Sequence, residues 1–265
     1  MSTYTTILCA NHSGVTTITL NRPEKRNALS PVMMEELTAA LNNSASSAEC
    51  GVVVLTGAGS AFCAGLDLEH LEAMATKTPE QHHEDSARVA KLFRALYDCP
   101  KPTIAAVNGA AIAGGTGLAF ICDFTLAVSE AKFGYTEVKI GFVPALVSSF
   151  LVLQIGEKAA RDLLLTGRLF NAQEAHDLGL VNEVVNPDEL TEHVRHLTHL
   201  LLRNSPESLR ATKQLLSEHS RARLDAEIAS SMKRNSASRS TADFQEGIRA
   251  FLEKRAPVWP SHKTK

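Results

Sequence analysis

The first half of the chain alternates short apolar runs with segments of helical periodicity. Residues 51–57 (GVVVLTG) are β-branched and apolar, which is typical of a strand buried on both faces. Residues 15–20 (VTTITL) predict a second strand, and the stretches 103–107 and 123–134 predict two more. Ser30 and Pro31 predict a helix start between the first two strands, because serine caps helices and proline suits the first helical position. This alternation predicts an α/β core.

After about residue 145 the strand signal fades and helical segments follow. We divide the chain into a core over residues 1–200 and a helical region over residues 201–265. A helical region with few strands often packs on another subunit, so we expect an oligomer. The helices are expected at residues 145–155, 157–166, 172–178, 188–203, 206–219, 222–232 and 241–253.

Composition limits the classes of function. The 265 residues carry a formal net charge of -2, which gives no basic field for nucleic acid or for a membrane surface. No apolar run reaches the roughly 18 residues that span a bilayer, and the N-terminus lacks the pattern of a secretory signal. The five cysteines are scattered, without a C-x-x-C pair. We therefore expect reduced thiols and a cytoplasmic protein.

Common cofactor and nucleophile patterns are incomplete. Two strand–glycine–helix stretches resemble dinucleotide sites, but Phe62 stands where the third glycine is needed and no acidic residue follows at the right distance. Ser148 and Ser149 lack the glycines of a hydrolase elbow. His193, His196 and His199 fall on the flank of a predicted helix, where solvated side chains are the favoured interpretation. We expect neither a metal nor a cofactor.

Six pieces, in order, resemble one family. They are NRPEKRNALS (21–30), GSAFCAGLDLEHL (59–71), NGAAIAGGTGLAFICDFTLA (108–127), AKFGYTEVKIGFVPA (131–145), LLLTGRLFNAQEAHDLGLVNEVV (163–185) and EGIRAFLEKR (246–255). Together they resemble the crotonase superfamily, also called the enoyl-CoA hydratase/isomerase family. The resemblance implies a spiral of β-β-α units, a helical C-terminal trimerisation region, and a homotrimer or dimer of trimers. It also implies an acyl-coenzyme A thioester as the substrate.

The resemblance assigns an oxyanion hole to two backbone amides. Chemistry next to a thioester carbonyl generates an enolate, whose oxygen needs fixed donors. The matching donors are the N–H groups of Leu66, in the AG-x-D turn, and of Gly114, at the start of a helix. Each such donor is typically worth about 3–4 kcal/mol of barrier. The alternative is that Gly114 and Gly115 only allow close helix packing.

The resemblance also places the coenzyme A. It puts the backbone of Ala64, Leu66, Asp67 and Leu68 around the adenine and pantetheine, and Lys25 and Arg26 near the phosphates. Phe251 and Lys254 match positions that a neighbouring subunit offers to the nucleotide. Solvated surface charges are the alternative for the three cations. Pocket walls are expected from residues 69–98 and 143–150.

The acidic residues differ from the pattern in the hydratases of the family that use two catalytic glutamates. Glu137 matches one catalytic glutamate, but Gly117 stands at the position of the other. We expect Glu137 to act alone, with open space beside Gly117 for a branched or carboxylated acyl chain. Asp67 and Asp123 are expected to be structural.

The pattern around Glu137 is similar to the methylglutaconyl-CoA and carboxygeranyl-CoA hydratase branch. It favours a hydratase that adds or removes water at the 2,3-position of an acyl-CoA. A Δ3-Δ2-enoyl-CoA isomerase with Glu137 as proton shuttle remains an alternative, as does a non-catalytic acyl-CoA-binding protein.

Overall fold

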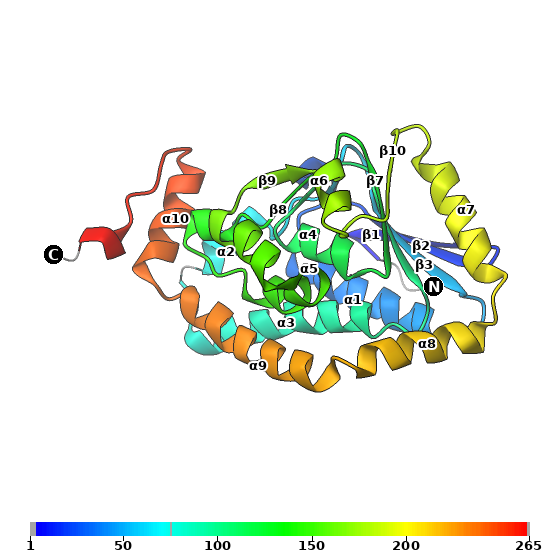
Figure 1. The fold of residues 1–265 in the computed structure, drawn as a ribbon. Coiled ribbons are helices and arrows are strands. Elements are labelled where there is room, and N and C mark those ends of the chain that lie inside the picture. Colours follow the sequence, from blue (N-terminus) through cyan, green and yellow to red (C-terminus); the bar gives the residue numbers. More distant parts are fainter. Residues whose placement is uncertain (1–3, 75, 264–265) are drawn as a thin grey trace.

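Two sheets form the core of the computed structural model, which describes residues 4–74 and 76–263 (Figure 1). The larger sheet has the order β1-β2-β3-β5-β7-β10 and the smaller β4-β6-β8-β9. The strands of the larger sheet are β1 (Ile7–His12), β2 (Val15–Leu20), β3 (Val52–Gly57), β5 (Thr103–Val107), β7 (Phe124–Val128) and β10 (Glu183–Val185). Those of the smaller are β4 (Ala61–Cys63), β6 (Ala110–Ile112), β8 (Lys132–Gly134) and β9 (Leu169–Asn171).

Successive strands along the chain alternate between the two sheets. β3, β5 and β7 lie parallel in the larger sheet, and each is followed by β4, β6 or β8 in the smaller one. Helices α2 (Leu68–Met74) and α3 (Pro79–Tyr97) follow β4, α4 (Gly114–Ile121) follows β6, and the 3₁₀ turn η2 (Glu137–Ile140) with α5 (Ala145–Thr166) follows β8. The result is the predicted spiral of β-β-α units.

The helix starts follow the local sequence. Helix α1 (Pro31–Ser46) begins after Ser30, whose hydroxyl accepts the Met33 N–H at 3.2 Å. Helix α3 begins with a capping box, in which Thr78 and Gln81 each bind the other's backbone N–H. The two helices expected over 145–155 and 157–166 are the two parts of α5, which breaks at Gly156 (φ 73°, ψ 168°).

Three sequence expectations were wrong in detail. The stretch 123–134 is not one strand but β7 and β8, which belong to different sheets. Strands β9 and β10 lie in the half that was expected to be helical, and β1 was missed. These strands are short or exposed, with five of the six β1 residues exposed, so they lack the apolar run that marks a buried strand.

The C-terminal helices wrap the core. They are α6 (Ala172–Asp177), α7 (Leu190–Leu202), α8 (Pro206–Glu218), α9 (Arg221–Ser238) and α10 (Ala242–Leu252), followed by the 3₁₀ turn η3 (Pro260–Lys263). Helix α9 packs against α3 and α5, whereas α10 stands at the end of the molecule (Figure 1). Within residues 4–74 and 76–263, no helix is both long and apolar enough to cross a membrane.

Candidate active site

Three neighbouring strands of the smaller sheet bring the predicted catalytic residues together. β4 pairs in parallel with β6 (Cys63 opposite Ala111), and β6 with β8 (Ile112 opposite Gly134). The residues that follow each strand therefore meet at one edge of the sheet. They include Leu66 after β4, Gly114 after β6 and Glu137 after β8, and all three line the same pocket.

The Leu66 amide is directed away from the neighbouring chain. In a parallel bridge, Leu29 N–H donates to Gly65 O at 2.7 Å and Asp67 N–H donates to Leu29 O at 3.0 Å. Leu29 thus binds the groups on either side of Leu66, so the N–H of Leu66 points to the opposite side. It is available as a donor to a ligand.

The Gly114 amide is the first of helix α4, so it has no acceptor within the helix. Ala113, directly before it, has φ 51° and ψ -119°, a conformation that costs an alanine about 1–3 kcal/mol. Ala113 N–H donates to Gly134 O at 2.7 Å and its carbonyl accepts Gly117 N–H at 3.1 Å, which fix this strained turn in place. The strain orients the peptide that carries the Gly114 N–H.

The glycines of this loop have different roles. A Cβ at Gly115 would overlap Cys63 O, so close packing requires glycine there. A Cβ at Gly114 would meet only Leu29 Cδ1, at an ordinary 3.5 Å. Packing within the protein therefore does not require glycine at position 114. Gly65 (φ 89°) is required, because its Cβ would lie 2.9 Å from Ile112 O.

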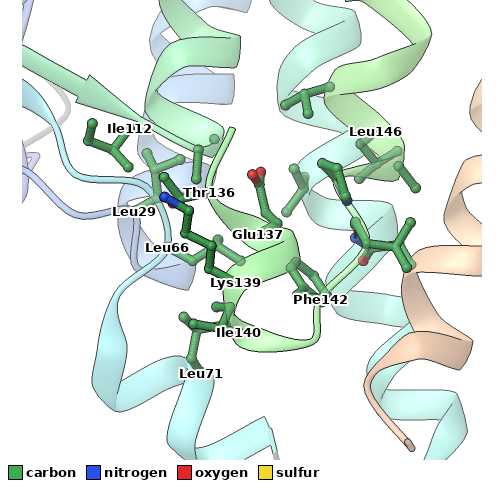
Figure 2. Close-up of a pocket in the computed structure, with 18 of the residues that line it drawn as sticks. Leu29, Leu66, Leu71, Ile112, Thr136, Glu137, Lys139, Ile140, Phe142 and Leu146 are labelled. Atoms are coloured by element: carbon green, nitrogen blue, oxygen red, sulfur yellow. Dashed lines mark hydrogen bonds between the residues drawn. The ribbon is translucent and has the colours of Figure 1, made fainter. Parts of the chain in front are cut away.

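The pocket has a volume of about 420 Å³ and a largely apolar lining. In Figure 2 the Glu137 carboxylate lies between Leu66 and Ile112 on one side, together with the polar Thr136 and Lys139, and Phe142 and Leu146 on the other. The expected walls are confirmed: residues Leu71, Val89 and Phe93 come from the first predicted region, and Val143–Val147 from the second.

Glu137 is buried, and its Oε2 has no hydrogen-bond partner among the residues described. Burial raises the pKa of this carboxyl from 4.5 to about 7, against a smaller lowering by its own backbone N–H. A group with a pKa near neutrality can both accept and donate a proton under working conditions. Helix α10 packs against the turn η2 that carries Glu137. Gly247 of α10 lies against Ile140, and Gly141, which ends the turn, lies against Asp243 of α10.

The expected open space beside Gly117 does not exist. A Cβ at Gly117 would lie 2.7 Å from Val147 Cγ1 and 3.1 Å from Phe93 Cζ. Both side chains fill the volume that a second glutamate would need, so the pocket wall closes there. The sequence has no second acid at this position, and the packed side chains leave no room for one.

The predicted coenzyme A residues divide into two groups. Ala64, Leu68 and Phe251 line the pocket, and the last two are exposed at 45% and 52%. Lys25, Arg26 and Lys254 are exposed and lie outside the pocket lining. Lys25 is paired with Glu69 at 2.5 Å.

Two aspartates near the site have structural partners. Asp67 pairs with Arg22 at 2.7 Å and caps α2 through the Glu69 N–H, while its own amide donates to Leu29 O, as described above. Asp123 accepts the Thr103 N–H at 2.7 Å, which holds the start of β5. The structural interpretation of both side chains agrees with these contacts.

A buried charge cluster at the pocket was missed by sequence reasoning. Asp85 on α3 pairs with Arg239, directly after α9, at 2.6 Å and with His70 on α2 at 2.6 Å. The Asp85–Arg239 partners are 154 residues apart, and no local pattern signals such a pair. Burial opposes ionisation of Asp85, but His70 and Arg239 together lower its pKa to about 2.

Metal-binding residues do not gather anywhere in the described ranges in groups of three or more. His193, one of the three histidines on α7, pairs with Glu183 at 2.6 Å. The buried thiols of Cys63 and Cys122 have raised pKa values, because burial disfavours the thiolate.

Two unpaired backbone amides and a buried carboxyl in one pocket suit the class of proteins that act on acyl thioesters. Comparison with known proteins identifies the family. The sequence model of the family described as enoyl-CoA hydratase/isomerase matches residues 10–262. The chain belongs to this family.

Individual relatives agree. A Thermus thermophilus protein that carries the name enoyl-CoA hydratase is 48% identical, over 92% of this chain and 96% of its own. A Mycobacterium bovis protein of the same name is 35% identical, over 96% and 98%. The crystal structure of an enoyl-CoA hydratase/isomerase from Xanthobacter autotrophicus superposes with a TM-score of 0.88 at 30% identity, over 96% and 98%.

Proposed function

We propose that the chain is an enoyl-CoA hydratase that uses Glu137 as its single acid/base. The observation that carries the proposal is the edge of the smaller sheet, where two free backbone amides and one buried carboxyl with a pKa near 7 line one apolar pocket. The names of the relatives support a hydro-lyase.

The residues suggest a sequence of proton movements. The thioester oxygen accepts the N–H groups of Leu66 and Gly114. The Glu137 carboxylate takes a proton from a water molecule, and the oxygen of that water bonds to Cβ as the Cα–Cβ double bond opens. The enolate that forms is stabilised by the two amides. Glu137, now protonated, gives the proton to Cα, which completes the addition of water and restores the carboxylate.

The isomerase alternative uses the same groups, so the two activities are distinguished by the identity of their products. Incubation with crotonyl-CoA, a 3-enoyl-CoA and 3-methylglutaconyl-CoA, with each product identified, is expected to show hydration of a 2-enoyl thioester. Glu137→Gln should lower kcat at least 100-fold and retain acyl-CoA binding, because a positioned acid/base contributes about 10²–10⁴-fold. Conversion of the 3-enoyl substrate alone would contradict the hydratase assignment. Tight binding without any turnover would favour the non-catalytic alternative.

We also propose a homotrimer or dimer of trimers that works in the cytoplasm. Exposed apolar side chains on α10, Phe251 and Leu252, support a contact between subunits, and all five cysteines are free thiols. In an assembly, Phe251 and Lys254 would reach the nucleotide bound to a neighbouring subunit, whereas Lys25 and Arg26 would lie near the phosphates of the coenzyme A bound to their own subunit. Light scattering coupled to size exclusion measures the assembly, and a monomer would contradict it. The division at residue 200 between the core and the oligomerisation region stays a prediction.

A further inference from the structure

A buried threonine connects the element that carries the Gly114 amide to the strand that leads to Glu137. Thr116 is the third residue of helix α4, and it has no exposed surface (0%). The described residues that line the pocket do not include it. Any effect of Thr116 on the reaction would therefore act through its neighbours.

The Thr116 hydroxyl bridges strands β6 and β8. Its Oγ1 donates to Ala111 O on β6 at 2.6 Å and accepts the Gly134 N–H on β8 at 3.2 Å. A hydroxyl can do both at once, because it has one proton and two lone pairs. Gly134 O lies 3.1 Å from the same Oγ1 and accepts the Ala113 N–H at 2.7 Å. One side chain thus ties the start of α4 to the ends of two strands.

The start of α4 has little else in its own sequence to hold it. Three of its first four residues are glycines, Gly114, Gly115 and Gly117, which are poor helix formers. Ala113, at the N-cap position, has no side-chain oxygen that could cap the helix. Strand β6, which leads into this turn, has three residues. The Thr116 hydroxyl supplies a fixed point two residues beyond the Gly114 amide.

The same hydroxyl is also close, along the chain, to the acid/base. Gly134 is the last residue of β8, and Glu137 follows three residues later at the start of η2. The link through Thr116 therefore connects the Gly114 amide to Glu137 by two short stretches of backbone. The two groups must meet the thioester oxygen and the reacting carbons at a fixed separation, and a displacement of about 1 Å can cost about 10²-fold in rate.

We propose that Thr116 is a positioning residue, whose hydroxyl sets the place of the Gly114 amide relative to the Glu137 carboxyl. The inference rests on the proposed function, because it assumes that these two groups act on one thioester. It gives a side chain outside the pocket a role in turnover rather than in the binding of substrate.

Three variants at this position test the hydroxyl. Thr116→Val replaces it by a methyl group, and kcat with crotonyl-CoA is expected to fall about 10–10²-fold. The Kd of butyryl-CoA, a saturated thioester that cannot be hydrated, should stay nearly unchanged. Thr116→Ser keeps the hydroxyl and should retain most of kcat. Thr116→Cys differs from the serine variant only by sulfur in place of oxygen, and its weaker hydrogen bonds should give an intermediate kcat.

Thr125 offers a matched control on the same helix. Its hydroxyl donates to Ala119 O at 2.9 Å, near the other end of α4, and its exposed fraction is 2%. Thr125→Val also removes a buried hydroxyl that holds α4, but at the end remote from Gly114. It should lose stability and keep kcat per folded molecule. Thermal unfolding measures the folded fraction of every variant.

Acetoacetyl-CoA provides a readout that does not require hydration. This thioester loses a proton to solvent from the carbon between its two carbonyls, and the resulting enolate absorbs in the ultraviolet. Two aligned amides favour the bound enolate over the bound neutral form. At saturation and constant pH, Thr116→Val is expected to hold less of the ligand as enolate than the wild type, Thr116→Ser or Thr125→Val. A general loss of stability would not produce this order among folded molecules.

The outcomes separate the two proposals. An unchanged kcat and enolate fraction in Thr116→Val overturns the inference, and so does a loss in Thr116→Ser as large as in Thr116→Val. An equal loss of kcat per folded molecule in Thr125→Val also overturns it. If Thr116→Val does not fold, the comparison of Thr116→Ser with Thr116→Cys decides. Absence of hydration by the wild type overturns the hydratase function, and the enolate fractions then still decide the inference. A wild type that neither hydrates nor binds the enolate overturns both.

Discussion

Val147 occupies the space that a side chain at Gly117 would need: its Cγ1 lies 2.7 Å from the ideal Cβ position of that glycine. The contact joins α4 to α5 and closes the wall of the pocket. It leaves no room at position 117 for the side chain of a second acid. A second acid would require a different residue at 147 as well as at 117.

Gly117→Ala is expected to destabilise the protein by about 1–3 kcal/mol, because the Val147 methyl is fixed by its β-branched side chain. Without the clash, alanine would stabilise this helix by up to about 1 kcal/mol, so the sign of the change is informative. Urea unfolding of Gly117→Ala, Val147→Ala and the double variant measures the coupling. Additive effects would contradict the contact. Gly117→Glu is expected to leave turnover no higher than that of the wild type.

The raised pKa of Glu137 predicts a pH-dependent cost of folding. The protonated form is favoured in the folded state, so this contribution to stability is present below about pH 4.5 and is lost as the pH rises through about 7. The free energy of unfolding of Glu137→Gln relative to the wild type should therefore rise by about 3 kcal/mol over this interval. Chemical denaturation at several pH values measures it. A constant difference would show that Glu137 has an ordinary pKa.

The same group predicts the pH dependence of hydration. Since the carboxylate must accept a proton from water, kcat/KM should rise with pH through an apparent pKa of about 7. Initial rates with crotonyl-CoA measure the profile. A rising limb near the ordinary carboxyl pKa would assign the base to a solvated carboxyl instead.

Gly65→Ala is expected to damage the oxyanion hole. The residue has φ 89°, and its Cβ would lie 2.9 Å from Ile112 O and 3.7 Å from the Gly114 N, so the two loops must separate. Loss of one aligned donor typically lowers kcat by about 10²–10³-fold. Gly179→Ala is the matched control, because Gly179 has φ 77° but no atom within 4 Å of its Cβ. Both variants should lose stability through backbone strain, and only Gly65→Ala should lose turnover per folded molecule.

Local signals were sufficient for much of the fold. The apolar strand at 52–57 and the cap at Ser30 are encoded by adjacent residues, and so is the break at Gly156. The order of the motifs also led to Leu66, Gly114 and Glu137, which the structure brings to one pocket.

Other features depend on contacts across the chain. The Asp85–Arg239 pair and the filling of the Gly117 site by Val147 arise only after α3, α4, α5 and α9 have packed, so no window of sequence contains them. The expectation of open space at Gly117 failed for this reason: the absence of a side chain in the sequence says nothing about which neighbour fills the gap.

The reacting groups and the rest of the pocket lining lie on different elements, which has an evolutionary consequence. The groups expected to perform the reaction follow strands β4, β6 and β8, whereas much of the remaining pocket lining comes from helices, chiefly α3 and α5. Substitutions on these helices can therefore change which acyl chain is accepted while the groups expected to perform the reaction stay unchanged. We therefore expect new substrates to arise in this family through changes on the helices, while the reacting groups are kept.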